Sequence, residues 1–371
     1  MAKIGVIGGG QLARMMVPPA VALGLEVCVL AETEGSSAAI AATAVGDYNQ
    51  LEVVREFAKT VDVITFDHEH VPLAILETLV AEGVRVHPAP SALRFAQNKL
   101  EMRRRLGELN LPMPDWAEIN TREELHEFLD AHDGEIILKT PIGGYDGKGV
   151  RVIRNVAEAE DWFAFAPLLA EEKVSFNREL AQLSARSATG EFRAWPLVQT
   201  VQLDGVCAEV LAPAPDADSA TLAYAVEIAR GVAEGLGVTG VLAVEMFETT
   251  DGRLVINELA MRPHNSGHFS IEGSVTSQFE QHLRAVAGLP LGSTDMTNTS
   301  AVMINLLGVD DQNDFVKHYK HAMQLHPHAK FHTYGKSARK GRKMGHVTVV
   351  ADEQGWALAE ARAAAAVLLR G

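Results

Sequence analysis

Lys139-Thr140-Pro141-Ile142-Gly143-Gly144-Tyr145-Asp146-Gly147-Lys148-Gly149-Val150 is the most informative stretch of this chain. Lys139 lies near the end of an apolar strand expected over residues 135–140, and a second strand is expected over 150–153. Four glycines in seven residues lie between them, so the loop can fold its amides over a phosphate and move as a lid. It is not a Walker A loop, because no Ser or Thr follows Gly147-Lys148 and no helix is expected there. The alternative is a flexible hairpin with a surface lysine, although lysines in buried strands are rare unless paired.

Two glutamates interrupt the apolar strands of a hairpin expected over residues 239–259. The turn Thr249-Thr250-Asp251-Gly252 would bring Glu245 almost opposite residues 257 and 258. Two ionised carboxylates side by side repel each other unless a divalent cation joins them. Oxygen ligands, with Asn257 beside Glu258, point to Mg²⁺ bound together with a phosphate substrate. The alternative is that one glutamate faces solvent or an ion-pair partner.

A loop rich in polar side chains, Arg262-Pro263-His264-Asn265-Ser266-Gly267-His268, follows this hairpin. A guanidinium, imidazoles and an amide suit a small planar anion and general acid–base chemistry. His264 and His268 could instead bind zinc, but Pro263 and Gly267 disfavour the helix that an i, i+4 pair of ligands needs.

The first 95 residues alternate short apolar runs with helical patterns, which predicts a doubly wound parallel sheet. Gly8-Gly9-Gly10-Gln11-Leu12-Ala13 lies where the first strand turns into the first helix, a place that favours an anion. With Glu32 after the second strand, it also matches the pattern of a dinucleotide site, and a purely structural turn is the third interpretation. We expect strands over 3–7, 25–30, 61–66 and 84–87, and helices over 11–23, 51–58 and 73–79.

Prolines at 88, 90, 112 and 114 flank a basic helix near residues 98–109, and we place a domain boundary around 90–98. Beyond the glycine-rich loop the pattern becomes antiparallel. The remaining expected elements are strands over 179–188, 195–203 and 207–212, a helix over 217–236, strands over 301–307 and 346–350, and a C-terminal helix rich in alanine.

Composition excludes several classes of protein. The chain has 371 residues, a net charge of −15, 47% hydrophobic and 6% aromatic residues. It is therefore not broadly disordered, and an acidic, aromatic-poor protein is not expected to bind nucleic acid. No apolar run approaches a membrane span, and two distant cysteines suggest a reducing, cytoplasmic compartment. The basic run 336–343 stands out, as a solvated turn or as a phosphate site, and the histidines within 318–332 are expected on a surface segment.

Taken in order, these motifs resemble the N5-carboxyaminoimidazole ribonucleotide synthetases, ATP-grasp enzymes of purine biosynthesis. The resemblance runs from about residue 3 to 350. The glycine loop and the acidic pair alone indicate an ATP-grasp enzyme, and Gly143-Gly144-Tyr145-Asp146-Gly147 and His264-Asn265-Ser266-Gly267-His268 narrow it to this family. The resemblance implies that bicarbonate attacks the γ-phosphate of ATP, and that the resulting carboxyphosphate, or CO₂ released from it, carboxylates aminoimidazole ribonucleotide. It also implies a closed site, because water would destroy carboxyphosphate.

The resemblance also implies a role for each site residue. Arg262, His264 and Asn265 would orient bicarbonate and stabilise carboxyphosphate, while Glu245 and Glu258 would hold Mg²⁺. The ribonucleotide would be bound by Lys336 and Arg342 at its phosphate, by the turn Gly10, Gln11 and Leu12, and by Glu69 at its ribose. ATP would be bound by Lys99 and Lys139 at the phosphates, the lid residues Gly144, Tyr145, Asp146, Gly147, Lys148, Gly149 and Val150, the adenine-binding stretch Glu171, Glu172, Lys173 and Val174, Glu179 at the ribose, and Asn257 and Glu258 beside the metal.

The expected fold class is α/β and α+β. A doubly wound domain covers residues 1–95, an ATP-grasp core 96–295 with a lid near 115–177, and a small C-terminal domain 296–371. A homodimer is expected by resemblance. Two departures from the family are Asp67-His68-Glu69-His70, where many members have Glu-Phe-Glu-Asn, and Gln202, where some have histidine. The alternatives are another ATP-grasp ligase, such as a formate-dependent ribonucleotide transformylase, an NAD-dependent oxidoreductase, and a nucleotide-binding regulator without turnover.

Overall fold

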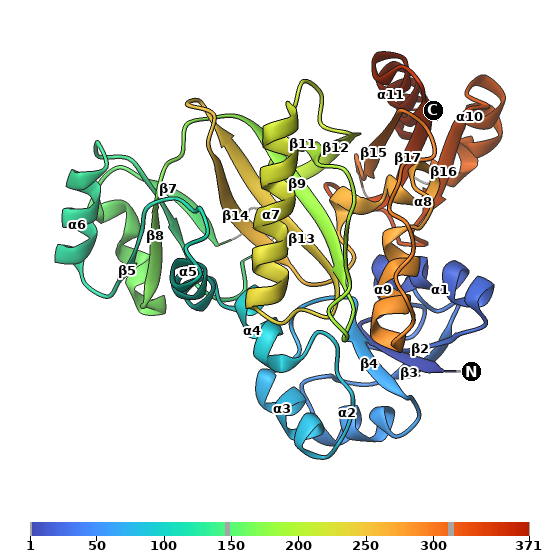
Figure 1. Ribbon diagram of the computed structural model, residues 1–371, viewed down its shortest axis with the longest axis horizontal. Coiled ribbons are helices and arrows are strands. Elements are labelled where there is room, and N and C mark those ends of the chain that lie inside the picture. Colours follow the sequence, from blue (N-terminus) through green and yellow to red (C-terminus); the bar gives the residue numbers. More distant parts are fainter. Residues whose placement is uncertain (1, 145–148, 311–314, 371) are drawn as a thin grey trace.

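The computed structural model describes residues 2–144, 149–310 and 315–370, which form three β-sheets with flanking helices (Figure 1). The predicted lid residues Tyr145, Asp146, Gly147 and Lys148 lie outside the described residues.

The N-terminal sheet is parallel, with strand order β3-β2-β1-β4, as the alternating pattern predicts. The strand expected over 84–87 is wrong, because only one bridge forms there, between Val86 and Ile64. Strands β1 and β4 are neighbours, so the glycine turn after β1 meets the loop after β4 at the same sheet edge. The elements are β1 (Lys3–Ile7), α1 (Gln11–Leu23), β2 (Glu26–Ala31), β3 (Ala42–Val45), α2 (Leu51–Ala58), β4 (Val63–Phe66) and α3 (Leu73–Ala81).

Two helices lead from this sheet to a small antiparallel sheet that projects from the molecule (Figure 1). Its strand order is β5-β8-β6-β7, and it has its own apolar core around Leu125, Leu138 and Leu168. A capping box between Thr121 and Glu124 begins its helix. The elements are α4 (Pro90–Gln97), α5 (Lys99–Glu108), β5 (Trp116–Ile119), α6 (Arg122–Ala131), β6 (Ile136–Lys139), β7 (Val150–Ile153), a 3-10 helix (Val156–Phe165) and β8 (Leu168–Glu172).

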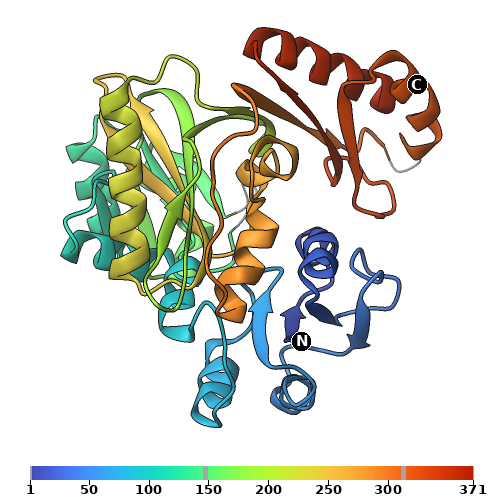
Figure 2. The same cartoon turned by 45° about the vertical axis from the view of Figure 1, so that its right-hand side comes forward.

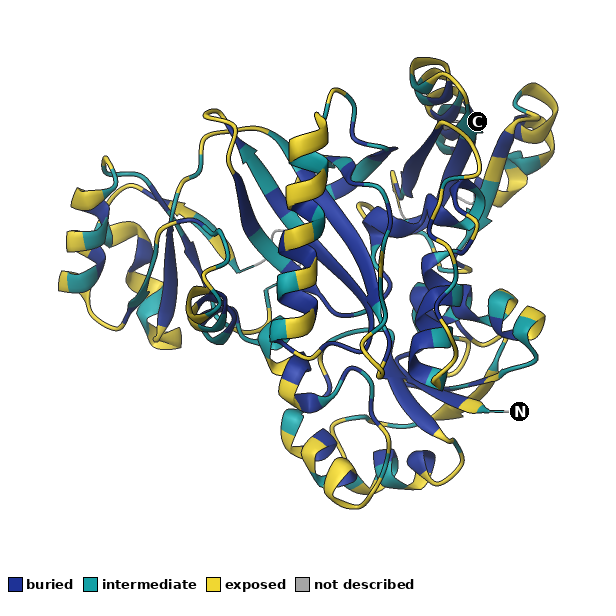
Figure 3. Cartoon of the chain, in the orientation of Figure 1, coloured by how far each residue is buried: buried dark blue, intermediate teal, exposed yellow. Residues whose placement is uncertain are grey.

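The largest sheet is antiparallel, in the order β14-β13-β9-β11-β12-β15-β17-β16, with β10 paired to β9. Strands β15 to β17 extend the sheet through the β12–β15 pair, so the C-terminal strands continue the core sheet. Helix α7 crosses the core part of the sheet, whose middle strands are buried (Figures 1 and 3). The core elements are β9 (Phe176–Arg186), β10 (Phe192–Ala194), β11 (Val198–Leu203), β12 (Val206–Ala212), α7 (Ser219–Gly235), β13 (Gly240–Thr249), β14 (Leu254–Ala260), a 3-10 helix (Asn265–Gly267), α8 (Ser270–Gly273) and α9 (Gln278–Ala287); the C-terminal elements are β15 (Ser300–Leu307), a 3-10 helix (Phe315–His318), α10 (Tyr319–Leu325), β16 (Ala329–Thr333), β17 (Lys343–Ala351) and α11 (Gln354–Arg370).

Apolar packing holds the N-terminal sheet against the rest of the chain. Leu12 and Met16 of α1 share a buried cluster with Phe279 and Leu283 of α9 and with Tyr334 from the C-terminal region. Burying a side chain of this size contributes about 1.5–3 kcal/mol. In the turned view, α1 lies between the N-terminal sheet and the C-terminal strands (Figure 2). Its first turn contacts the segment after β16, where Lys336 donates to Gln11.

Candidate active site

Glu245 and Glu258 are direct partners in the register of β13 and β14. The register then shifts, so that Met246 pairs with Ile256 and Asn257 has no partner across the hairpin. This bulge lets the neighbouring side chains of Asn257 and Glu258 serve the same face of the sheet. Burial, the nearby Glu258 carboxylate and Glu179 raise the pKa of Glu245 to about 8. The predicted acidic pair is therefore present, with the mutual repulsion that a divalent cation would remove.

Two buried lysines face this pair from two other elements. The Lys139 Nζ, at the end of β6, donates to Asn257 Oδ1 at 3.2 Å. The Lys99 Nζ, at the start of α5, lies 3.3 Å from Glu258 Oε1 and donates to the Gly144 carbonyl at 3.1 Å. Lysines this buried are held by such partners. The structure thus brings together the lysines, the acidic pair and the beginning of the glycine loop.

The described ends of the glycine loop are closely packed. Thr140 N donates to Gly149 O, and Lys139 pairs with Val150 across β6 and β7. Gly149 has φ +69°, and a Cβ there would lie 2.5 Å from Thr140 Oγ1, so this position requires glycine.

A buried ion-pair network that the sequence analysis missed supports Lys139. Glu171 Oε2 lies 2.6 Å from Lys139 Nζ, and Arg103 Nε donates to Glu171 Oε1 at 2.5 Å. Burial alone would raise the pKa of Glu171, but Arg103 and Lys139 outweigh it and hold this pKa at about 2. Arg103 is one of three consecutive arginines, and only its buried position in α5 distinguishes it.

The expected adenine-binding stretch runs from the end of β8 towards β9. Glu172 Oε1 accepts from Asp115 N, and Lys173 Nζ donates to Glu135 Oε2, so these side chains face the lid. Val174 is half-buried in the connection to β9. Glu179, on β9, pairs with Phe247 of β13, and burial raises its pKa, although the Gln202 side chain opposes the shift. Gln202 thus lies beside the predicted ribose ligand.

The loop after β14 carries the predicted anion-binding residues. Arg262 Nε lies 3.3 Å from Glu69 Oε2, while Glu69 Oε1 accepts from Met261 N at 2.6 Å. Glu69 therefore lies against this loop. The buried amide of Asn265 makes no hydrogen bond to another oxygen or nitrogen within the described residues, and its neighbour is the buried Cys207 thiol. Such an unsatisfied buried amide in a polar loop indicates a place for a ligand.

His264 joins this loop to the acidic pair, since its Nε2 lies 3.1 Å from Glu245 Oε1. Its Nδ1 accepts from Ser266 N and contacts Ser266 Oγ at 2.9 Å, which assigns the ring proton to Nε2. Burial and then Arg262 and Lys343 lower the pKa of His264 well below its usual value. A neutral imidazole therefore directs an N–H towards the carboxylates.

Gln278, another residue that the sequence analysis missed, holds this loop. Its Oε1 accepts from His264 N at 2.8 Å, and its Nε2 donates to His264 O at 2.7 Å. The same Nε2 contacts His268 Nδ1 at 2.8 Å. The side chains of His264 and His268 thus have different partners, and no group of three or more metal-binding side chains occurs among residues 2–144, 149–310 and 315–370.

The glycine turn and the basic run meet at the base of α1. Lys336 Nζ donates to Gln11 Oε1, and Arg342 Nη1 donates to Ser337 O and Oγ, both at 3.1 Å. Burial lowers the pKa of Lys336 to about 8; Asp67 opposes this shift, whereas the nearby Arg342 and Lys343 add to it. The two weak motifs of the sequence therefore lie in one place.

Asp67 explains why this turn is not a dinucleotide site. Its carboxylate accepts from Gly10 N and Ala13 N, both at 2.8 Å, at the N-terminus of α1. A pyrophosphate would need these same amides. A Cβ on Gly10 would lie 2.0 Å from Asp67 Oδ2, so glycine is required by the carboxylate itself.

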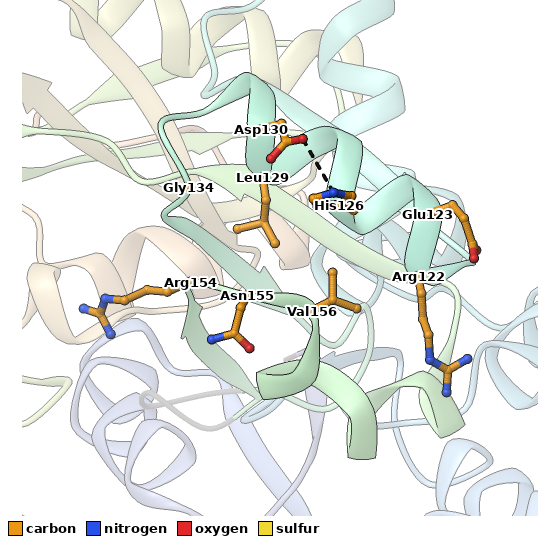
Figure 4. Close-up of a pocket in the computed structure, with 9 residues that line it drawn as sticks. All are labelled: Arg122, Glu123, His126, Leu129, Asp130, Gly134, Arg154, Asn155 and Val156. Carbon is orange, nitrogen blue, oxygen red and sulfur yellow. Dashed lines mark ion pairs between the residues drawn. The ribbon is translucent and has the colours of Figure 1, made fainter.

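A hollow of about 490 Å³ on the lid lies apart from all of these residues (Figure 4). Arg122 and Arg154 line it at opposite ends, and each already has an ion-pair partner, Glu160 and Glu135. It contains no predicted site residue.

A projecting lid with a glycine loop, two buried lysines and an acidic pair on an antiparallel core define an ATP-grasp ligase. Family models agree: residues 1–97 match a ribonucleotide synthetase preATP-grasp domain, 104–279 an ATP-grasp domain, and 301–360 a phosphoribosylaminoimidazole carboxylase C-terminal domain. The chain belongs to the N5-carboxyaminoimidazole ribonucleotide synthase family.

Known members are similar over nearly the whole chain. The N5-carboxyaminoimidazole ribonucleotide synthase of Mycobacterium tuberculosis is 46% identical over 359 residues, covering 94% of this chain and 84% of that protein. An ADP complex of an N5-carboxyaminoimidazole ribonucleotide synthetase has a TM-score of 0.90 at 34% identity, covering 98% and 96% of the two chains. The Aspergillus clavatus enzyme in complex with ADP and 5-aminoimidazole ribonucleotide has a TM-score of 0.89 at 32% identity, covering 100% and 99%.

Proposed function

We propose that this chain carboxylates 5-aminoimidazole ribonucleotide to N5-carboxyaminoimidazole ribonucleotide, using ATP and bicarbonate, in purine biosynthesis. The contact between His264 Nε2 and Glu245 Oε1 carries the proposal, because it places the anion-binding loop directly beside the acidic pair. A bicarbonate held by that loop would therefore meet the γ-phosphate of ATP.

For ATP, the proposed binding residues are the cations and backbone groups on the two sides of the lid. Lys99 and Lys139 neutralise the phosphates, with Asn257 beside them, and Gly144 to Val150 cover them. Glu171 to Val174 take the adenine through the backbone, and Glu179 takes the ribose. Phosphoryl transfer needs mainly alignment and charge neutralisation, which these residues provide.

The residues present fit a magnesium ion, because the carboxylates of Glu245 and Glu258 are register partners and burial keeps Glu245 close to neutral without a cation. Bound there, Mg²⁺ would draw off negative charge from the phosphate oxygens of ATP.

In the proposed first step, a bicarbonate oxygen attacks the γ-phosphorus, the bond to the β-phosphate oxygen breaks, and ADP leaves. Arg262 and the Asn265 amide orient the bicarbonate, and His264 donates from Nε2, because Nδ1 already accepts from Ser266. In the second step the exocyclic amine of the ribonucleotide attacks the carboxyl carbon, either of carboxyphosphate or of CO₂ formed from it. Phosphate leaves and the amine loses a proton.

For the ribonucleotide, we propose that Lys336 and Arg342 bind the 5′-phosphate and that Gly10, Gln11 and Leu12 close the other side. The contact between Lys336 and Gln11 supports this pairing. Glu69 is proposed for the ribose, and its contact with Arg262 would tie that end of the substrate to the bicarbonate loop.

We also propose three domains, over residues 1–95, 96–295 and 296–371, with a lid near 115–177. The protein is proposed to be a homodimer and to be located in the cytoplasm. None of the helices among the described residues is long and apolar enough to cross a membrane.

The test is ADP release with ATP, Mg²⁺ and bicarbonate, with and without aminoimidazole ribonucleotide. The proposal predicts ADP formation that rises sharply with the ribonucleotide, together with bicarbonate-dependent loss of the ribonucleotide. If the rate of ATP hydrolysis does not depend on the ribonucleotide, the chain uses ATP but the ribonucleotide is not its acceptor. Turnover with formate in place of bicarbonate would indicate a transformylase, and no ATP turnover would indicate a nucleotide-binding regulator.

A further inference from the structure

Arg103 is a fully buried arginine between three parts of the molecule. It projects from α5 and donates from Nε to Glu171 Oε1 of β8, in the lid. Its other two nitrogens donate to backbone carbonyls of β14 in the core: Nη1 to Ile256 O and Nη2 to Asn257 O, both at 2.8 Å. One side chain therefore ties the lid sheet to the core sheet.

On the core side, these bonds fall at the bulge in β14. This strand ends the large sheet, so one of its edges has no neighbouring strand in the described part of the chain. Ile256 N uses that edge to donate to Pro112 O, and the bulge removes Asn257 from the ladder with β13. Buried carbonyls without partners are costly, and the guanidinium satisfies two of them. Arg103 thus holds the backbone that presents Asn257 and Glu258.

On the lid side, Glu171 links Arg103 to Lys139. Glu171 Oε2 contacts Lys139 Nζ, which in turn donates to Asn257 Oδ1. The four residues form a closed circuit that begins and ends on β14. A planar guanidinium fixes the angles between its acceptors, which a flexible ammonium does not.

We propose that Arg103 is a positioning residue for ATP, which sets the place of Lys139 in the lid relative to Asn257 and Glu258 in the core. It touches neither substrate. The inference rests on the proposed ATP site. A buried network of charged side chains is often no more stabilising than apolar side chains of equal volume. A gain in stability alone therefore gives little reason for an arginine at position 103.

Arg104 provides a matched control in the same helix. It also reaches the lid, through an ion pair with Glu118 of β5, but both side chains are substantially exposed. Arg104→Met removes an α5-to-lid contact of the same kind without disturbing Lys139, Asn257 or Glu258.

The experiment compares Arg103→Met, Arg103→Lys and Arg104→Met in the full chain. It measures the dissociation constant of Mg-ATP, KM for ATP, KM for the ribonucleotide, and Tm. We expect Arg103→Met to weaken ATP binding and raise KM for ATP by about ten-fold or more. In Arg103→Met, KM for the ribonucleotide should stay within about two-fold of wild type. In Arg104→Met, the dissociation constant and both KM values should stay within about two-fold of wild type, and Tm should be little changed. Arg103→Lys keeps the buried charge but lacks the planar guanidinium that donates to three acceptors at once. This variant should therefore fold and still show a raised KM for ATP.

An Arg103→Met or Arg103→Lys variant that folds and binds ATP like wild type would overturn the inference. So would equal rises in both KM values, since these would indicate a general loss of structure. If Arg103→Met does not fold, Arg103→Lys decides by the same criteria. Failure of the wild-type chain to bind Mg-ATP at all would instead contradict the proposed function, so the two failures are distinguishable.

Discussion

Glu245 of β13 stands directly opposite Glu258 of β14, and the register of the two strands breaks at the next residue. Residues directly opposite in an antiparallel pair have Cβ atoms only about 4.5–5.5 Å apart. Like charges at this separation destabilise each other, and the raised pKa of Glu245 expresses that conflict. The break at Asn257 adds an amide to the same face without moving the carboxylates apart.

Replacing Glu258 by glutamine should abolish turnover but leave the fold intact. The change removes one proposed magnesium ligand, so kcat should fall by about 10³-fold or more at any Mg²⁺ concentration. It removes a charge that repels Glu245 but also the charge partner of the buried Lys99, so the two effects oppose each other and Tm of the metal-free protein should change little. Steady-state ADP release and thermal unfolding measure the two effects. Turnover near that of wild type at saturating Mg²⁺ would contradict a role as ligand.

The control for this variant is Glu248→Gln on the neighbouring strand β13. Glu248 pairs with Arg178 at 2.6 Å, away from the described residues of the proposed phosphate and metal sites. Its loss leaves a largely buried arginine without its charge partner, so we expect lower stability, by about 1–3 kcal/mol, with kcat unchanged. The two variants should therefore show opposite patterns of stability and activity.

Arg342→Ala should raise KM for the ribonucleotide and leave KM for ATP unchanged. Arg342 lies in the basic run beside Lys336, whereas Lys99 and Lys139 serve the other phosphate site. Loss of one charge-assisted phosphate contact should cost about 1.5–3 kcal/mol, or roughly 10- to 100-fold in KM. Arg362→Ala, which removes an exposed arginine paired with Glu209, is the control. If only KM for ATP changed, the two phosphate sites would have been assigned the wrong way round.

The pH dependence of ribonucleotide use should report Lys336. Its pKa is about 8 because of burial, so its positive charge is present below pH 8 and is lost as the pH rises through 8. A neutral amine binds the 5′-phosphate less well, so kcat/KM for the ribonucleotide should fall above about pH 8. Lys336→Arg stays charged at every pH used and should remove this fall. The same alkaline fall in both proteins would exclude Lys336 as its source.

Much of the core was predictable because its signals are local. The alternation of apolar residues over β13 and β14, with a four-residue turn between them, predicted a hairpin that brings Glu245 opposite Glu258. The strand expected over 84–87 failed because a run of four residues before a proline gives too little pattern to separate a strand from one bridge. Helix α4 carries a detectable signal, a proline at its first position.

Other features depend on contacts between distant residues. Arg103 is the first of three consecutive arginines, and nothing local says which of the three will be buried. Asp67 at the start of α1 is 57 residues from the Gly10 amide that it accepts from, so the glycine turn alone could not reveal that it was already occupied. The meeting of Lys336 with Gln11 likewise joins two ends of the chain.

Gln278 and Gln281 offer a test of whether the polar loop must be held in place. Both are fully buried in α9, and each uses its amide to bind backbone groups of a loop. Gln278 binds His264 N and O, whereas Gln281 binds Gly292 N and O at 2.7 and 2.8 Å. A methionine of similar size at either position leaves two partly buried backbone groups unsatisfied, and Gln278→Met also removes the contact to His268 Nδ1, so each variant should lose about 2–4 kcal/mol of stability.

Activity should separate these two variants. Gln278→Met releases the backbone of His264, whose Nε2 must remain near Glu245, so kcat should fall by about 10²-fold with KM for ATP little changed. Gln281→Met should keep kcat within about two-fold, because Gly292 lies outside the site. Thermal unfolding confirms that both have lost comparable stability, and initial rates at a temperature where both are folded give kcat. Equal kcat values in the two variants would show that the loop keeps its geometry without Gln278.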